Sequence, residues 1–149
     1  MRFTALIAIL VAVTLSAGNI GRVYVYSRRD TPARSWLSIS CDHAVAAEVK
    51  QGRFFAIDVP AGRHALFVER GVPVSFDVRP GEELFVRLDW NHAMDRAPIP
   101  VLLKIDAAAA RREMRFLSYV ESKKIHSDLV AKTDPSPAPE PRLRTRDQK

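Results

Sequence analysis

Residues 72–90, VPVSFDVRPGEELFVRLDW, decide the fold class of this chain. Two runs of alternating residues flank a turn that contains Pro80 and Gly81. In the second run the even positions are apolar and the odd positions are mostly polar. The apolar set is Leu84, Val86, Leu88 and Trp90, and the other set is Glu83, Phe85, Arg87 and Asp89. A period of two residues is typical of a strand with one buried face. The stretch therefore predicts two antiparallel strands joined by a turn.

The same pattern extends over most of the chain. Four glycines, at positions 52, 62, 71 and 81, lie nine or ten residues apart in polar or proline-containing breaks. Such regular turns indicate short antiparallel strands. The alternating segments are residues 22–26, 36–41, 45–49, 55–59, 64–68, 72–78, 84–90 and 99–105. About seven to eight strands are enough for two packed sheets, so we expect an antiparallel β-sandwich.

After the last of these strands the period changes to that of a helix. Asp106 can cap a helix that begins at Ala107, and the alanines that follow favour helix propagation. We predict one helix over residues 107–124, with an apolar face made of Ala110, Met114, Leu117 and Val120. Lys123 and Lys124 suit its negative end. We expect it to cover a face or edge of the sandwich, with a partner-binding helix as the alternative.

The two ends of the chain differ from its middle. Arg2, an uncharged apolar run over residues 3–15, and the small residues 16–18 together form the pattern of a signal peptide, residues 1–18. The alternative is an uncleaved anchor. Residues 132–149 alternate proline with small or polar residues and end in a basic segment, so we predict a disordered tail. The folded domain is then residues 19–131, in a periplasmic or extracellular protein.

The charge excludes some partners. The chain of 149 residues has 23 lysines and arginines against 17 acidic residues, for a net charge of +6, and its one cysteine cannot form an internal disulfide. The cations are dispersed and the basic tail has no aromatic residue, whereas binding to nucleic acid needs a concentrated basic stripe. We therefore expect no nucleic-acid partner. Anionic envelope polymers or lipid head groups are better targets, and peripheral membrane contact is compatible with this charge.

The loop after the seventh alternating run contains the densest set of reactive side chains. Trp90 could stack on a sugar while Asn91, His92 or Asp95 bonds its hydroxyl groups, so these four residues are our candidate ligand-binding set. The parity of Trp90 also allows it to close the end of the core. Asp89, His92 and Asp95 have a spacing that indicates a metal only weakly. We predict no metal and no cofactor.

A second candidate is centred on the single cysteine. Cys41, Asp42 and His43 are neighbours, so a nucleophile with its base is conceivable. Cys41 shares parity with Leu37 and Ile39, however, which favours a buried and inert thiol. His64 opens a strand and is expected to pack at the end of a sheet. We therefore predict no catalytic residue.

A family resemblance agrees with this architecture. Its motifs are residues 22–26 (RVYVY), 52–55 (GRFF), 59–66 (VPAGRHAL) and 76–87 (FDVRPGEELFVR). In these motifs the chain resembles the exported bacterial domain-of-unknown-function family 2846, itself similar to PEGA and transthyretin-like β-sandwiches. The resemblance covers about residues 22–105 and implies a fold but no activity. Members usually have an Asp-Gly turn where this chain has Asp42-His43.

Taken together, these observations lead to two functional hypotheses. The first is an exported, non-catalytic β-sandwich of the cell envelope that acts as an accessory or binding module for a protein or glycan. The alternative is a small hydrolase that uses Cys41 or the Asp89–Asp95 loop. A sandwich without a converging catalytic set is more often a scaffold for contacts, so we favour the first.

Overall fold

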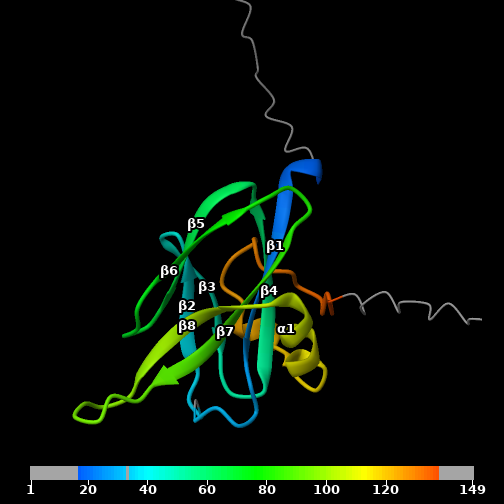
Figure 1. The fold of residues 1–149 in the computed structure, drawn as a ribbon. Coiled ribbons are helices and arrows are strands. Elements are labelled where there is room, and N and C mark those ends of the chain that lie inside the picture. Colours follow the sequence, from blue (N-terminus) through cyan, green and yellow to red (C-terminus); the bar gives the residue numbers. More distant parts are fainter. Residues whose placement is uncertain (1–16, 33, 138–149) are drawn as a thin grey trace, which may run out of the picture.

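The computed structural model describes residues 17–32 and 34–137, which form nine strands in two sheets, one α-helix and two short 3-10 helices (Figure 1). The predicted signal peptide falls on residues that lie almost entirely outside this range. Residues 138–149 of the predicted tail also lie outside it. Within the described ranges, no helix is long and apolar enough to cross a membrane.

The two sheets confirm the predicted β-sandwich. The five-stranded sheet has the order β8-β7-β1-β4-β9, with β1 at Ile20–Ser27, β4 at Arg53–Pro60, β7 at Glu83–Asn91, β8 at Ile99–Ile105 and β9 at Ser118–Tyr119. The four-stranded sheet has the order β3-β2-β5-β6, with β2 at Leu37–Cys41, β3 at Ala44–Val49, β5 at Gly62–Val68 and β6 at Val74–Val78. Strand pairs are antiparallel except β1 with β7 and β4 with β9, which are parallel.

The main core lies between the two sheets. Val25 and Ile57 from the five-stranded sheet pack against the same cluster as Ile39 from the four-stranded sheet, and all three are fully buried. The alternation that predicted the strands therefore marks their inward faces. Removal of these apolar side chains from water is the main source of stability in a chain with no internal disulfide.

A second, smaller core covers the outer face of the five-stranded sheet. Tyr24, Tyr26 and Phe85 point away from the main core, yet they are buried beneath α1 (Ala107–Met114), which contributes Ala110 and Met114. The Tyr24 and Phe85 rings stack with centroids 5.1 Å apart. Figure 1 shows α1 beside β7 and β4. The helix therefore packs on its own sandwich and adds a third layer.

The predicted extent of the helix is wrong. Its start is confirmed, because the Asp106 carboxylate accepts a hydrogen bond from the Ala109 amide at 3.0 Å. The helix ends at Met114 instead of continuing to residue 124, and the two predicted C-terminal lysines lie in the 3-10 helix η2, Ser122–Lys124. The backbone of residues 118–120 instead pairs with β4, where Val120 donates to the Phe54 carbonyl at 2.9 Å. Pairing with an open strand edge outweighs helix propagation for these β-favouring residues.

The segment after α1 closes one side of the sandwich. β9 pairs with the start of β4, and Val130 forms a bridge to Ile57 further along that strand. Ile125 bridges to Ala47 of β3, the edge strand of the other sheet. The same segment therefore covers one edge of each sheet, at β4 and at β3, and a covered edge cannot pair with another chain. The other 3-10 helix, η1 (Ala17–Asn19), precedes β1.

Candidate functional site

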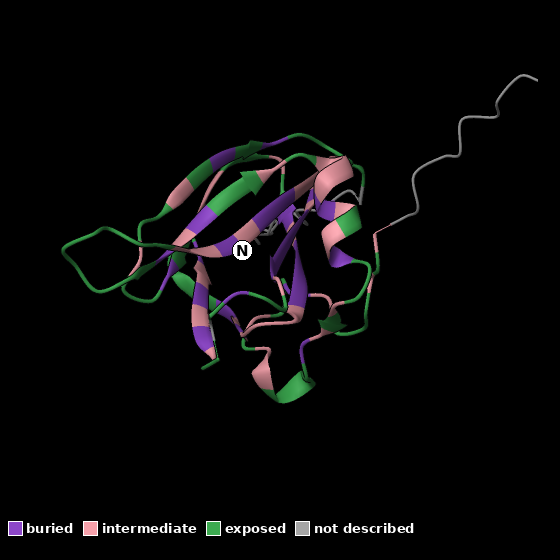
Figure 2. Ribbon diagram, turned by 60° about the horizontal axis from the view of Figure 1, so that its bottom comes forward, coloured by how far each residue is buried: buried purple, intermediate pink, exposed green. Residues whose placement is uncertain are grey.

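The four residues predicted to bind a ligand lie at the end of the β7–β8 hairpin. Trp90 is partly buried and packs against the main core, as its parity allowed, and its indole nitrogen is buried without a hydrogen-bond partner. Asn91 is exposed at the end of β7, and His92 and Asp95 are exposed in the loop beyond it. Figure 2 shows this loop as an exposed extension from the sandwich. The ring that was expected to stack on a sugar is therefore turned toward the core, and the ligand-binding role stays a prediction.

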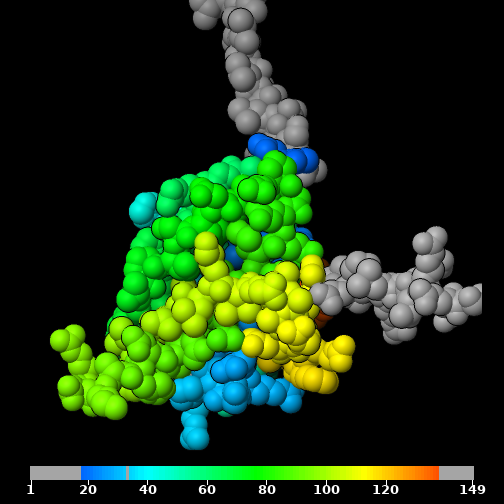
Figure 3. Space-filling view, viewed as in Figure 1, coloured from blue at the N-terminus to red at the C-terminus, as the bar shows by residue number. Residues whose placement is uncertain are grey.

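A different part of the molecule gathers cationic side chains. A surface pocket of about 360 Å³ is lined by Arg29, Arg34, Lys50, Gln51, Gly52, Arg53 and Ser118. Four of these seven residues are cations, and none is acidic. The pocket lies near the loop that follows β1, at the end of the sandwich opposite to the first residue of β1; Figure 3 shows that loop in blue at the bottom of the molecule. We call it the basic pocket.

Local backbone geometry brings these cations together. Arg29 belongs to the loop after β1, while Lys50 and Arg53 flank the tight turn between β3 and β4. Gly52 in that turn has φ +75, in the left-handed region that favours glycine, and its amide donates to the Ser27 carbonyl at 2.9 Å. The two loops are therefore held against each other by a backbone hydrogen bond.

The cations of the basic pocket have little compensating charge. Within residues 17–32 and 34–137, none of the four forms an ion pair with a carboxylate. The pKa of Glu121 is lowered mainly by the hydrogen bond and the charge of Lys123, and the charges of Arg53 and Lys50 lower it further. Such a group of unpaired cations attracts an anion.

A larger surface pocket has the opposite electrostatic character. It measures about 540 Å³ and includes Arg22 and Asp58, which form a two-pronged ion pair with N–O distances of 2.7 and 2.9 Å. Glu82 and Glu83 also line it. The one cation that lines this pocket, Arg22, is already paired with Asp58, so an anion would bind less well here than in the basic pocket.

An indole ring lies beside the basic pocket. The Lys50 ammonium group lies 4.7 Å from the centroid of Trp36, and that of Lys124 lies 4.6 Å from it. Trp36 is partly buried and packs against the main core, which fixes the ring. Cations over a tryptophan face are attracted by its electron-rich surface, so the indole orients both lysines.

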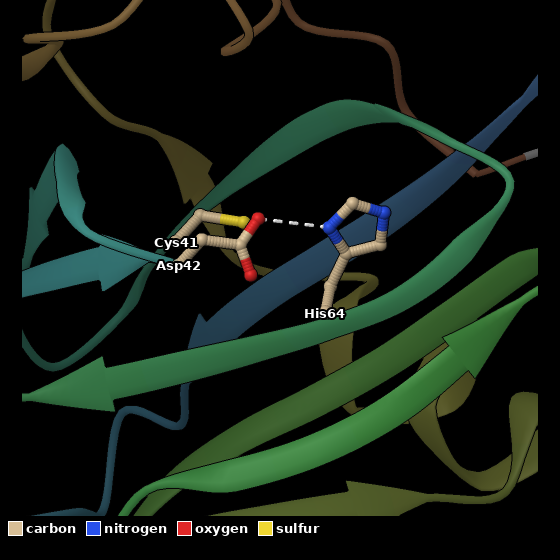
Figure 4. A group of neighbouring side chains, drawn as sticks. All are labelled: Cys41, Asp42 and His64. Carbon is tan, nitrogen blue, oxygen red and sulfur yellow. Dashed lines mark hydrogen bonds and ion pairs between the residues drawn. The ribbon is translucent and has the colours of Figure 1, made fainter.

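The cysteine of the alternative hypothesis meets a different histidine from the one expected. Cys41 ends β2, Asp42 follows it in the hairpin turn, and His64 lies on the neighbouring strand β5. Figure 4 shows these three side chains converging. His64 Nδ1 lies 2.9 Å from an Asp42 carboxylate oxygen, and His64 Nε2 lies 2.7 Å from the Pro60 carbonyl oxygen. His43, the sequence neighbour, is exposed.

The electrostatics of this group do not favour a nucleophile. Burial raises the pKa of the Cys41 thiol to about 11, and the Asp42 charge adds to this effect. Burial opposes the charge of His64, but its hydrogen bonds to Asp42 and Pro60 raise its pKa above the ordinary value. Both ring nitrogens are engaged with oxygen acceptors. A thiol–imidazole pair needs a free ring nitrogen directed at the sulfur, and here that nitrogen is occupied.

No family model, no curated protein and no solved structure matches this chain. The functional reading therefore depends on the chemistry of the side chains. In the sequence the cations are dispersed, and the turn at Gly52 is the only local signal near this pocket. The signal that would have joined them is the pairing of β1 with β4, which places the two loops at one end of the sandwich.

Proposed function

We propose that this chain is an exported, non-catalytic binding module of the cell envelope, and that its basic pocket holds an anionic group of an envelope glycan. The observation that carries the proposal is the convergence of Arg29, Arg34, Lys50 and Arg53 around one pocket, without an ion-pair partner in the described part of the chain. Arginine forms paired hydrogen bonds with planar carboxylates and with phosphates, so a repeated anionic sugar supplies suitable groups.

The competing hydrolase hypothesis receives less support. A catalytic cysteine requires a thiolate near neutral pH, whereas burial raises the pKa of Cys41 to about 11. In the other half of that hypothesis, Asp89 is bonded to Arg87 at 3.2 Å and to the Trp90 amide at 2.9 Å, so its carboxylate is already engaged. Among the residues that the structure describes, the four cations of the basic pocket form no ion pair with a carboxylate, and Arg53 donates only to the Tyr119 carbonyl at 3.5 Å.

The proposal is tested by binding to polysaccharides of known charge. The purified protein is titrated by calorimetry with polygalacturonate, which carries a carboxylate on each sugar, and with uncharged dextran. The test variant replaces the four pocket cations by glutamine, as R29Q, R34Q, K50Q and R53Q. We expect polygalacturonate binding to weaken by about tenfold or more, because that factor corresponds to only about 1.4 kcal/mol of lost contacts.

A matched variant separates a site from general attraction. It carries the same change in net charge at four exposed arginines elsewhere on the surface, as R63Q, R70Q, R79Q and R96Q. Screening by salt should weaken both proteins, but only the pocket variant should lose binding at fixed ionic strength. Equal losses in the two variants, or binding to phosphatidylglycerol vesicles without binding to the polysaccharide, would contradict the glycan site.

A further inference from the structure

The group Cys41, Asp42 and His64 has the composition of a metal site. One ligand atom from each residue, a sulfur, a carboxylate oxygen and a ring nitrogen, lies within 4.8 Å of the other two. Figure 4 shows the side chains directed at one another from two strands and the turn between β2 and β3. Thiolate, imidazole and carboxylate are the protein ligands of zinc.

The atoms of these side chains that face away from the group are held in place. His64 Nε2 lies 2.7 Å from the Pro60 carbonyl oxygen, to which it donates. The second Asp42 oxygen accepts the Ala65 amide at 3.0 Å, and the Asp42 amide donates to the Ala65 carbonyl at 2.8 Å. A metal-bound histidine characteristically donates its other N–H to a carbonyl or a carboxylate, because this fixes the ring. These bonds therefore hold the His64 ring with Nδ1 directed into the group.

The three side chains are buried to different degrees, so the group is open to solvent on one side. Cys41 is 5% exposed and the His64 side chain is 12% exposed, whereas the Asp42 side chain is 48% exposed. Asp42 also has φ 55, in the left-handed region, which turns its carboxylate back over the strand end. Aspartate tolerates this conformation better than most residues. Three ligands would thus come from the protein, and a water could approach from the side of Asp42.

We propose that Cys41 Sγ, an Asp42 carboxylate oxygen and His64 Nδ1 bind one Zn²⁺ ion, with water as the fourth ligand. Bonds of about 2.0–2.3 Å in a tetrahedron put ligand atoms about 3.3–3.8 Å apart. The 2.9 Å contact between Nδ1 and the Asp42 oxygen would open slightly. Any pair of ligand atoms separated by close to 4.8 Å, the upper limit within this group, would move closer together. These are small side-chain movements on strands whose register is fixed.

The protons of this reaction balance simply. The thiol proton of Cys41 and the proton shared between His64 Nδ1 and Asp42 both pass to solvent, and the ion then occupies the space between the three ligand atoms. No oxidation step is involved. Metal ligands must be deprotonated, so binding releases protons and is linked to pH.

Cobalt provides the direct test, because Co²⁺ adopts the zinc geometry and gives a strong thiolate-to-metal absorption band in the near ultraviolet. The purified, reduced protein is titrated with Co²⁺, and Zn²⁺ is then added. We expect the band to saturate at one equivalent and to disappear when Zn²⁺ displaces the cobalt. Absence of the thiolate band would overturn the proposal.

Variants assign the remaining ligands. His64→Gln should weaken cobalt binding by about tenfold or more, since each lost ligand or supporting contact typically has an effect of that size. Cys41→Ser should abolish the thiolate band. The matched control is His126→Gln, which removes a histidine that bonds to Glu48 and not to this group. Circular dichroism checks the folding of each variant. Binding by His64→Gln that equals the control would remove His64 from the site.

A measurement on the unmodified protein keeps the test valid even if a variant fails to fold. Zinc X-ray absorption of the loaded protein should show one sulfur at about 2.3 Å and nitrogen or oxygen ligands at about 2.0–2.2 Å. A coordination shell with only nitrogen and oxygen would assign the ion to surface histidines and carboxylates instead. That result would contradict the proposal independently of the basic pocket.

Discussion

Gly71 and Gly81 must both be glycine, but for different physical reasons. At Gly71 an added Cβ would lie 2.4 Å from the Pro100 carbonyl oxygen and 2.2 Å from a Val68 methyl group. Gly71 lies where the loop after β5 passes close to β8, so one of its clashes is with backbone that cannot move aside. At Gly81 an added Cβ meets nothing within 4 Å, but φ is +74. The first glycine is required by space and the second by backbone conformation.

The two alanine variants should therefore differ in stability. Gly71→Ala should lower the free energy of unfolding by about 3 kcal/mol, because overpacking of a rigid site costs that much. Gly81→Ala should lower it by about 1 kcal/mol, the cost of an L-residue in the left-handed region. Urea unfolding followed by circular dichroism measures both. A loss at Gly81 equal to or greater than that at Gly71 would show that the loop after β5 moves freely.

At the scale of one element, the last residue of α1 and the turn that follows it offer a matched pair of large apolar residues. Met114 is 4% exposed and packs in the smaller core, whereas Phe116, two residues later, is 68% exposed. Met114→Ala should destabilise the protein by about 2–4 kcal/mol through lost burial and the cavity left behind. Phe116→Ala should change stability by no more than about 0.5 kcal/mol.

Thermal or urea unfolding of Met114→Ala and Phe116→Ala distinguishes self-packing from a partner-binding helix. If α1 docks on its own sandwich, the large loss belongs to Met114 alone. Small effects for both variants would mean that the helix detaches from the sheet in solution. A large effect for Phe116→Ala would place that ring in a contact within the isolated protein that the structure does not contain.

The strands could be predicted from sequence because, in a half-buried strand, every second residue is apolar and faces the core. Val23 and Val25 follow this rule. The burial of Tyr24, Tyr26 and Phe85 on the outer face could not be predicted, because it depends on where α1 and the segment after it are placed. The predicted end of the helix was wrong for the same reason. Residues 118–120 pair with the open edge of β4, and the helical periodicity of the sequence carries no information about that edge.

The candidate sites were less predictable than the strands. Sequence proximity paired Cys41 with His43, but the register of β2 against β5 sets Cys41 opposite Leu66 and so brings His64 to the turn. The cations of the basic pocket come from two separate loop regions, Arg29 and Arg34 from one and Lys50 and Arg53 from the other, and only the meeting of these regions joins them. Both groups depend on strand pairing, which composition and spacing do not specify.

At the scale of the whole molecule, the segment after α1 connects the two sheets. An ion cluster joins its 3-10 helix region to β3: Glu48 accepts from His126 at 2.9 Å and from Lys124 at 3.4 Å. The backbone adds a hydrogen bond from the His126 amide to the Ala46 carbonyl at 2.9 Å. Closure of this side therefore has a charged component as well as an apolar one.

This cluster makes closure depend on pH. The hydrogen bond from His126, followed by the contributions of Lys124, lowers the pKa of Glu48 below its ordinary value of 4.5. A carboxylate with a lowered pKa in the folded state stabilises the fold above pH 4.5, and this contribution disappears as the pH falls through the folded pKa. Glu48→Gln should therefore reduce stability at neutral pH by about 0.5 kcal/mol, the size expected for a partly exposed pair.

Urea unfolding of the wild-type protein and of Glu48→Gln at pH 7 and at about pH 3 tests this link, since at the lower pH the carboxylate should be mostly protonated in the unfolded chain and its advantage reduced. The difference between the two proteins should shrink at acidic pH. Glu69→Gln, an exposed carboxylate after β5, is the matched control and should show no such trend. A difference that persists unchanged at acidic pH would mean that Glu48 acts through packing. In that case closure of the two sheets would rest on apolar packing and on the backbone contacts of Ile125, His126 and Val130.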